Sequence, residues 1–211
     1  MIKIKICGIR RPEDVIVLNQ LMPDYAGFVF ADSKRQISVR EAERLSEMMD
    51  RNITRVGVFA GQSPEFIAEL LNAGIIHRAQ LHGDENQEYR IELKKRIHKP
   101  ENRKLILAYR INTKKDIRSI NIEEEDDLLL DSGITASGGS GLTFDWSVTD
   151  GMNRSFFLAG GLNEKNIASA VKQVRPWAVD VSSGVETDGY KDPEKMHRFI
   201  SELRRAEEQL Q

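Results

Sequence analysis

Residues 127–132 read Asp-Leu-Leu-Leu-Asp-Ser, and the three leucines stand together with no alternation of apolar and polar positions. Strands with one face in water alternate, whereas strands covered on both faces are apolar throughout. Residues 127–130 therefore predict a strand of a parallel sheet that is buried on both faces. Asp131 follows this strand directly.

Seven further short runs are rich in β-branched and apolar residues, and helical patterns lie between them. The first residues of consecutive runs are 22 to 30 positions apart, which is the length of one strand-plus-helix unit. The predicted strands are 2–6, 25–30, 55–59, 78–81, 105–109, 127–130, 156–159 and 178–181.

Helix-start signals follow several of these strands. Ser38 and Glu41 form a capping box, in which each side chain can bond the other residue's backbone. The pairs Ser63-Pro64 and Asp192-Pro193 each place an N-cap residue before a proline at the first helical position. Further helices are predicted over 86–97 and 163–174, with shorter ones near 113–120 and 145–149.

Eight strands alternating with helices predict parallel strands, because each crossover returns the chain to the same end of the sheet. Eight such units close into a (β/α)8 barrel of the TIM type. A doubly wound open sheet is the alternative, but the Gly-x-Gly-x-x-Gly fingerprint that often marks it is absent. We expect residues 1–211 to form a single α/β domain.

The composition excludes several classes of protein. The 211 residues carry 31 basic and 33 acidic side chains, and this balance argues against a nucleic-acid-binding face. No apolar run approaches the roughly 20 residues that span a bilayer. The single cysteine, Cys7, excludes an internal disulfide and a multi-cysteine zinc site. The sequence thus predicts a cytoplasmic globular protein that binds neither nucleic acid nor membrane.

Barrel enzymes carry their active sites where strands end and the following loops begin. Gly160-Gly161 follows the seventh strand and Ser182-Ser183-Gly184 the eighth, and these two loops commonly form the phosphate pocket of such barrels. For either loop alone a tight turn is the better explanation of the glycines, but the two loops together favour a phosphate. A third glycine-rich stretch, 138–141, could close over a ligand.

Cys7 and Asp131 stand at the ends of the first and sixth strands. A lone buried thiol is often inert packing, and an aspartate after a strand often caps a loop. At a barrel mouth, however, a thiolate can act as a base and a partly desolvated carboxyl group as an acid. For each residue alone the two interpretations are evenly balanced, but a thiolate base and a carboxylic acid on different strands together suit proton transfer.

Three other polar residues are candidates for substrate binding, each with a simpler alternative. Arg35 can hold an anion or be a solvated surface arginine, and His82 can line the pocket or be structural. Asp180 can orient a substrate hydroxyl or be a buried structural carboxylate. With no second histidine at a strand end, a metal site is not expected. An acid and a base that face one small site need no redox cofactor, so none is expected.

The strand-end motifs, in order, are Lys3-Ile4-Lys5-Ile6-Cys7-Gly8-Ile9, Gly27-Phe28-Val29-Phe30, Val56-Gly57-Val58-Phe59, Gln80-Leu81-His82-Gly83-Asp84-Glu85, Leu129-Leu130-Asp131-Ser132, Gly138-Gly139-Ser140-Gly141 leading to Phe144-Asp145-Trp146, Leu158-Ala159-Gly160-Gly161-Leu162 and Asp180-Val181-Ser182-Ser183-Gly184-Val185-Glu186, with Gly189, Lys191 and Asp192 beyond. In these motifs the sequence resembles the phosphoribosylanthranilate isomerase family, (β/α)8-barrel enzymes of tryptophan biosynthesis. The resemblance covers nearly the whole chain.

The resemblance implies an Amadori rearrangement, an aldose–ketose isomerisation of N-(5-phosphoribosyl)anthranilate to 1-(2-carboxyphenylamino)-1-deoxyribulose 5-phosphate. Carried over by motif, Asp131 is the general acid that opens the ribose ring, and Cys7 is the general base that takes the proton from C2. Arg35 would hold the anthranilate carboxylate, and Asp180 would support the sugar chemistry. The phosphate would be held by backbone groups around Gly160, Gly161, Ser183 and Gly184.

The sequence departs from the family in two loops. The family usually reads Ser-Pro-Arg after the second strand, where this chain has Ser33-Lys34-Arg35, and Asp188 stands where proline is common. Two other functions stay open: another phosphosugar isomerase or epimerase of the phosphate-binding barrels, or a non-catalytic barrel that binds a phosphorylated ligand. The oligomeric state, monomer or homodimer, is not fixed by the sequence.

Overall fold

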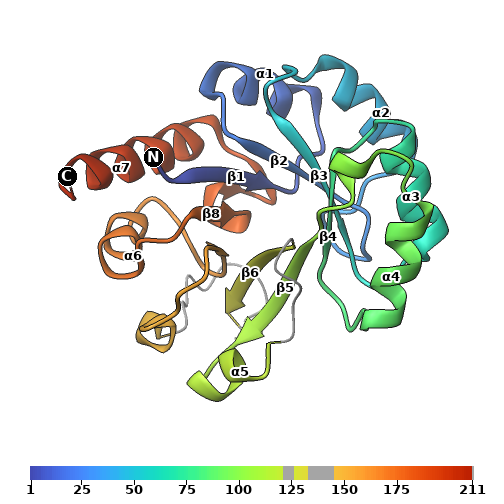
Figure 1. Cartoon of the computed structure of the whole chain (residues 1–211). Coiled ribbons are helices and arrows are strands. Elements are labelled where there is room, and N and C mark those ends of the chain that lie inside the picture. The colour runs from blue at the N-terminus through green and yellow to red at the C-terminus, as the bar shows by residue number, and fades with distance from the viewer. Residues whose placement is uncertain (121–125, 133–144, 211) are drawn as a thin grey trace. The chain divides into compact units, whose positions relative to one another are not determined.

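A computed structural model describes residues 1–120, 126–132 and 145–210 (Figure 1). Eight parallel strands form one closed barrel in the order in which they occur along the chain, which confirms the predicted (β/α)8 fold. They are β1 (Lys3–Cys7), β2 (Tyr25–Val29), β3 (Thr54–Phe59), β4 (Arg78–Leu81), β5 (Ile106–Ile111), β6 (Asp127–Ser132), β7 (Phe156–Leu158) and β8 (Ala178–Val181).

Helices and short 3-10 turns connect the strands. In chain order they are α1 (Pro12–Leu21), α2 (Val39–Met48), α3 (Pro64–Asn72), α4 (Gln87–Arg96), η1 (Pro100–Asn102), α5 (Lys114–Arg118), η2 (Trp146–Thr149), α6 (Ile167–Val174), η3 (Ser183–Val185) and α7 (Pro193–Glu208). A short hairpin, β9 (Glu186–Thr187) with β10 (Tyr190–Lys191), precedes α7.

The contacts of the chain cluster into two units. The amino-terminal unit holds Ile6–Ala108 and Glu123–Asp127, and the carboxy-terminal unit holds Met1–Lys5, Tyr109–Ile122 and Leu128–Gln211. Each is described by itself.

In the amino-terminal unit, α1 to α4 cover the outer side of the strands (Figure 1). β2 pairs with β3 from Tyr25↔Thr54 to Val29↔Val58, and β3 continues onto β4. Phe30 and Phe59 stack with their ring centroids 5.3 Å apart, and Phe66 of α3 meets both edge-on. This aromatic cluster buries the apolar face of α3 against the ends of the strands.

In the carboxy-terminal unit, β6, β7 and β8 pair in parallel, and α6 packs beside α7. The start of β1 belongs to this unit, because the Lys3 N–H donates to the Trp177 carbonyl over 3.0 Å. The Arg204 guanidinium of α7 donates to the Ile2 carbonyl over 2.8 Å, so the amino terminus lies against the last helix (Figure 1). These contacts hold the first strand in register with the last.

The predicted helix starts are confirmed where side chains cap them. Ser38 accepts from the Glu41 N–H, Ser63 from the Phe66 N–H, and Asp192 from the N–H groups of its helix's first turn. The prediction for 163–174 is wrong at its start: α6 begins at Ile167, because Asn163 and Asn166 bond each other in a local turn that competes with the helix. Residues 145–149 form a 3-10 turn rather than an α-helix.

The described part of the chain contains no helix with the length and apolar character needed to cross a membrane.

Candidate active site

Cys7 is the last residue of β1 and is 8% exposed. Its side chain packs with Val29, Val58 and Ala31 in a small apolar cluster. Gly27 of β2 comes so close that a Cβ atom there would lie 2.7 Å from the Cys7 Sγ. The thiol therefore sits at a strand end, as predicted, and a glycine on the neighbouring strand makes room for it.

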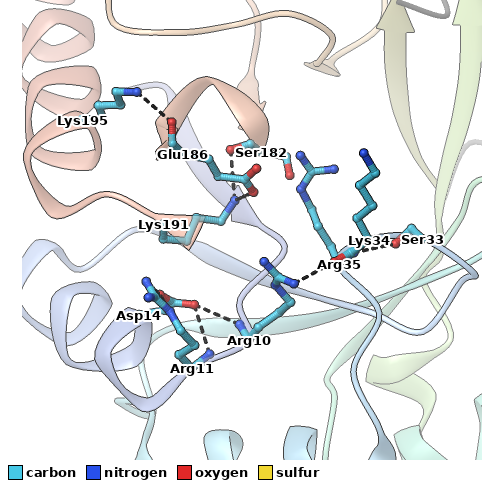
Figure 2. A network of polar contacts seen from close by, with 10 residues as sticks. All are labelled: Arg10, Arg11, Asp14, Ser33, Lys34, Arg35, Ser182, Glu186, Lys191 and Lys195. Atoms are coloured by element: carbon cyan, nitrogen blue, oxygen red, sulfur yellow. Dashed lines mark hydrogen bonds and ion pairs between the residues drawn. The ribbon is translucent and has the colours of Figure 1, made fainter. Parts of the chain in front are cut away.

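The loop that follows Cys7 is fixed by a buried carboxylate. Asp14, 3% exposed in the first turn of α1, accepts from the backbone N–H groups of Arg10 and Arg11 over 3.0 and 3.1 Å. Its other oxygen pairs with the Arg11 guanidinium at 2.8 Å (Figure 2). Asp14 thus binds both the backbone and a side chain of this loop, and these bonds restrain the segment that follows β1.

Arg35 lies half-buried in the loop between β2 and α2. Its N–H donates to the Ser33 hydroxyl over 3.1 Å, and the Arg10 guanidinium donates to the Lys34 carbonyl over 2.7 Å (Figure 2). Lys34 replaces the proline that is usual in the family, and proline would have restricted this backbone through its fixed φ. Here the hydrogen bond from Arg10 restrains the loop instead.

His82 follows β4 directly and is half-buried. The amide nitrogen of Gln80 lies 3.2 Å from its Nδ1, which fixes the ring beside the end of β4. The Gln80 Oε1 atom is buried without a hydrogen-bond partner. The oxygen of this amide therefore lacks a hydrogen-bond donor among the described residues.

Asp131 lies within β6 rather than just after its end, and its side chain is half-buried. The end of β7 runs beside it: the Ala159 N–H donates to the Leu130 carbonyl over 2.8 Å, and Gly160 lies against Ser132. The structure thus places Asp131 next to the loop that begins with Gly160 and Gly161.

The two predicted phosphate loops touch each other. Gly184, in η3 after β8, approaches the loop after β7 so closely that a Cβ atom would lie 1.8 Å from the Leu162 carbonyl oxygen. Gly161 is held by its carbonyl, which accepts from the side-chain amides of Asn163 and Asn166. Ser183 lies beside Gly184 in the same turn. These contacts bring the loop after β7 and the turn after β8 together, and the binding of a phosphate by Gly160, Gly161, Ser183 and Gly184 stays a prediction. The glycine-rich stretch 138–141 lies outside the described residues.

A buried ammonium fixes the loop after β8. Lys191 of β10 donates to the Ser182 carbonyl over 3.0 Å and pairs with Glu186 at 2.7 Å, both side chains being buried (Figure 2). Lys195 of α7 donates to the Glu186 carbonyl over 2.7 Å. Lys191 was part of the sequence motif, but its bond to the Ser182 carbonyl follows only from the hairpin β9–β10, which turns the chain back toward Ser182.

The turn of this hairpin explains the second departure from the family. Asp188 and Gly189 adopt φ values of 52° and 78°, both in the left-handed region that two-residue hairpin turns of type I′ require. Proline is locked at a φ of about −65° and is incompatible with that turn. Asp188 therefore permits the hairpin conformation from which Lys191 reaches back to Ser182.

Asp180 of β8 is 9% exposed and forms an ion pair with Lys5 of β1, with 2.7 Å between Nζ and Oδ2. Lys5 is fully buried. The sequence identified Asp180 as a candidate but missed Lys5. The signal was a lysine within a strand expected to be covered on both faces, where an ammonium group needs an acidic partner.

The candidate residues thus divide between the two units. Cys7, Arg35 and His82 lie at strand ends or in the following loops of the amino-terminal unit. The carboxy-terminal unit carries the others: Asp131, Gly160, Gly161, Asp180, Ser183 and Gly184. Among the residues that the structure describes, no three His, Cys, Asp or Glu side chains form a group suited to a metal ion. The predicted absence of a metal and cofactor remains a prediction.

A family model described as N-(5'phosphoribosyl)anthranilate (PRA) isomerase matches residues 4–202. The chain is 45% identical to the N-(5'-phosphoribosyl)anthranilate isomerase of Thermoanaerobacter pseudethanolicus (strain ATCC 33223 / 39E), covering 97% of this chain and 98% of the relative. A crystal structure of phosphoribosyl anthranilate isomerase from Thermotoga maritima is similar, with a TM-score of 0.87, 38% identity and coverage of 97% and 99%. A phosphoribosyl anthranilate isomerase in complex with reduced 1-(o-carboxyphenylamino)-1-deoxyribulose 5-phosphate has a TM-score of 0.82 and 36% identity over the same shares of the two chains.

Proposed function

The chain belongs to the N-(5'-phosphoribosyl)anthranilate isomerase family, and from that membership we propose that Cys7 and Asp131 carry its acid–base chemistry. The enzyme isomerises N-(5-phosphoribosyl)anthranilate to 1-(2-carboxyphenylamino)-1-deoxyribulose 5-phosphate in tryptophan biosynthesis. This reaction moves protons and opens a ring, so it needs one acid and one base.

Asp131 is the acid. It gives its proton to the ring oxygen of the ribose as the bond between that oxygen and C1 breaks. The nitrogen lone pair of the anthranilate forms the new C=N bond of a Schiff base, so the electrons balance. Support comes from the half-buried position of Asp131 in β6, where a carboxyl group is partly shielded from water.

Cys7 is the base. Its thiolate takes the proton from C2, the C–H electrons form a C1=C2 bond, and the Schiff-base electrons return to nitrogen. The resulting enolamine then tautomerises to the ketone: the C2 hydroxyl loses its proton, C2=O forms, and the C1=C2 electrons take up a proton at C1. Support comes from the position of Cys7 at the end of β1, because barrel enzymes carry their reacting groups at such ends.

The remaining candidates bind the substrate in this proposal. Arg35 pairs with the anthranilate carboxylate through its planar fork, and His82 lies beside the substrate. Asp180 accepts from the sugar. The phosphate is held by backbone groups of the two touching loops, at Gly160, Gly161, Ser183 and Gly184.

The observation that best supports the assignment of the base is the close approach of Gly27 to Cys7, because it gives the thiol a defined place at the strand end. The reaction itself is tested with purified, EDTA-treated protein and phosphoribosylanthranilate. We expect loss of the anthranilate-type fluorescence without added metal or nucleotide. No turnover by protein that circular dichroism shows to be folded would contradict the proposal. The cytoplasmic location and the state as monomer or homodimer remain predictions.

A further inference from the structure

Lys5 is the most deeply buried charged residue among those that the structure describes, with an exposed fraction of 0%. Lysine is almost never fully buried unless an acidic group pairs with it. Its partner is Asp180, whose Oδ2 lies 2.7 Å from the Lys5 Nζ. β1 and β8 meet at this pair, within the carboxy-terminal unit.

The two oxygens of Asp180 are in different situations. Oδ2 accepts from Lys5, whereas Oδ1 is buried and has no hydrogen-bond partner among the residues that the structure describes. A carboxylate has acceptor sites on both oxygens, and a buried acceptor without a donor destabilises a protein. Such an atom in a native structure calls for a donor that arrives from elsewhere.

We propose that Lys5 is a positioning residue for Asp180: it binds Oδ2 and thereby presents Oδ1 to a hydroxyl group of the substrate's sugar. This inference rests on the function proposed above. The Lys5 ammonium compensates the buried negative charge and fixes the plane of the carboxylate, while Oδ1 stays open for a donor.

The chemistry of the substrate selects the sugar as the donor. Its phosphate and its anthranilate carboxylate are both negatively charged, and each would be repelled by the Asp180 carboxylate. The ribose hydroxyls are neutral donors. Asp180 also stands three residues before Ser183, so one short segment would contact the sugar and then the phosphate attached to it.

A double-mutant cycle on Lys5→Met and Asp180→Asn tests this role, with kcat/KM for phosphoribosylanthranilate and the thermal unfolding midpoint as readouts. Lys5→Met alone leaves a buried, uncompensated carboxylate and Asp180→Asn alone leaves a buried, uncompensated ammonium, so either single variant can fail to fold. The double variant removes both charges. Where a single variant does not fold, kcat/KM of the double variant against wild type decides the question: a loss of about 10- to 100-fold is expected, and the wild-type value would overturn the inference. Lys3→Met is the matched control, because Lys3 is an exposed lysine on the same strand.

We expect Asp180→Asn to lower kcat/KM about 10- to 100-fold, the worth of a hydrogen bond to a charged group. Adding Lys5→Met should then change kcat/KM by no more than about twofold, because Lys5 acts only through Asp180. Lys3→Met should retain the wild-type value.

Provided that the wild-type enzyme is active, either of two results would overturn this inference and leave the proposed function standing. Wild-type kcat/KM in Asp180→Asn would show that the pair is merely structural, whatever its effect on the unfolding midpoint. A further loss of about tenfold or more in the double variant would show that Lys5 acts independently of Asp180. Absence of turnover by the wild-type enzyme would instead overturn the proposed function, and this inference with it.

Discussion

A Cβ atom at position 27 would lie 2.7 Å from the Sγ of Cys7 and 3.0 Å from its Cα. Cβ atoms do not approach other heavy atoms this closely, so any side chain on Gly27 would displace the thiol. A glycine on the neighbouring strand thus sets the position of the proposed base.

Gly27→Ala should lower kcat about 100-fold, because displacing a reacting group by about 1 Å has an effect of that size. The control is Gly57→Ala on β3, where a Cβ atom would lie 2.7 Å from side-chain atoms of Ile76 and Phe59 but away from Cys7. Both variants should be less stable, and only Gly27→Ala should lose turnover in steady-state assays. Equal kcat values in the two variants would refute this link.

Gly184→Ala should raise KM at least about tenfold and change kcat little, since its Cβ atom would meet the Leu162 carbonyl oxygen and push the two phosphate loops apart. Inhibition by inorganic phosphate should weaken in parallel. Gly57→Ala serves as the comparison, because its Cβ atom would also meet close neighbours, but these are side-chain atoms of Ile76 and Phe59 rather than the two loops. If KM and phosphate inhibition stay at wild-type values in Gly184→Ala, these loops do not hold the phosphate.

The predicted single domain can be tested with probes that the chain already carries. Trp146 and Trp177 lie in the carboxy-terminal unit, and the lone Cys7 lies in the amino-terminal unit. Tryptophan fluorescence and pulse-alkylation of Cys7 should therefore report the same denaturant midpoint if residues 1–211 unfold as one cooperative domain. Two distinct midpoints would show two domains.

His77 gives the stability a pH dependence. Burial, and then the charges of Arg55 and Lys99, lowers the pKa of His77 to about 4, below its ordinary value of 6.5. The folded protein thus favours the neutral ring, so its contribution is fully present above pH 6.5 and is lost as the pH falls toward about 4.

Between about pH 7.5 and 5, the free energy of unfolding should fall by about 1 kcal/mol more in the wild type than in His77→Gln. This is less than the full pKa shift of His77 would give, because the ring is only half-buried and solvent screens its charge. Urea titrations at the two pH values measure this difference. An identical pH dependence in both proteins would rule out the role of His77.

Much of the fold could be predicted because its signals are local. The apolar run Leu128-Leu129-Leu130 and the caps Ser38, Ser63 and Asp192 each act within a few residues of chain. Helix α1 was not predicted individually, since its N-cap is Arg11, which is not a favoured capping residue, and Asp14 supplies the bonds. Each strand of the β9–β10 hairpin has two residues, too few for any periodicity.

Only those site residues that lie at strand ends could be located from the sequence. The positions of Cys7, His82 and Gly160 follow from where strands stop, so the sequence located them. The pair of Lys5 with Asp180 joins residues 175 positions apart, and nothing local tells which acid a buried lysine meets. The bond from Lys191 to the Ser182 carbonyl likewise joins residues nine positions apart, and its only local signal is the Asp188-Gly189 pair, which is typical of a two-residue hairpin turn.

The central claim is that Cys7 is the catalytic base, and kcat of Cys7→Ala tests it most directly. Val29→Ala is the matched control, because Val29 packs in the same cluster as Cys7 but carries no reactive group. We expect Cys7→Ala to lose about 10²- to 10⁴-fold in kcat while remaining folded, and Val29→Ala to lose stability but keep its turnover. A Cys7→Ala enzyme with near-wild-type kcat would show that the thiol only packs, and would contradict the account.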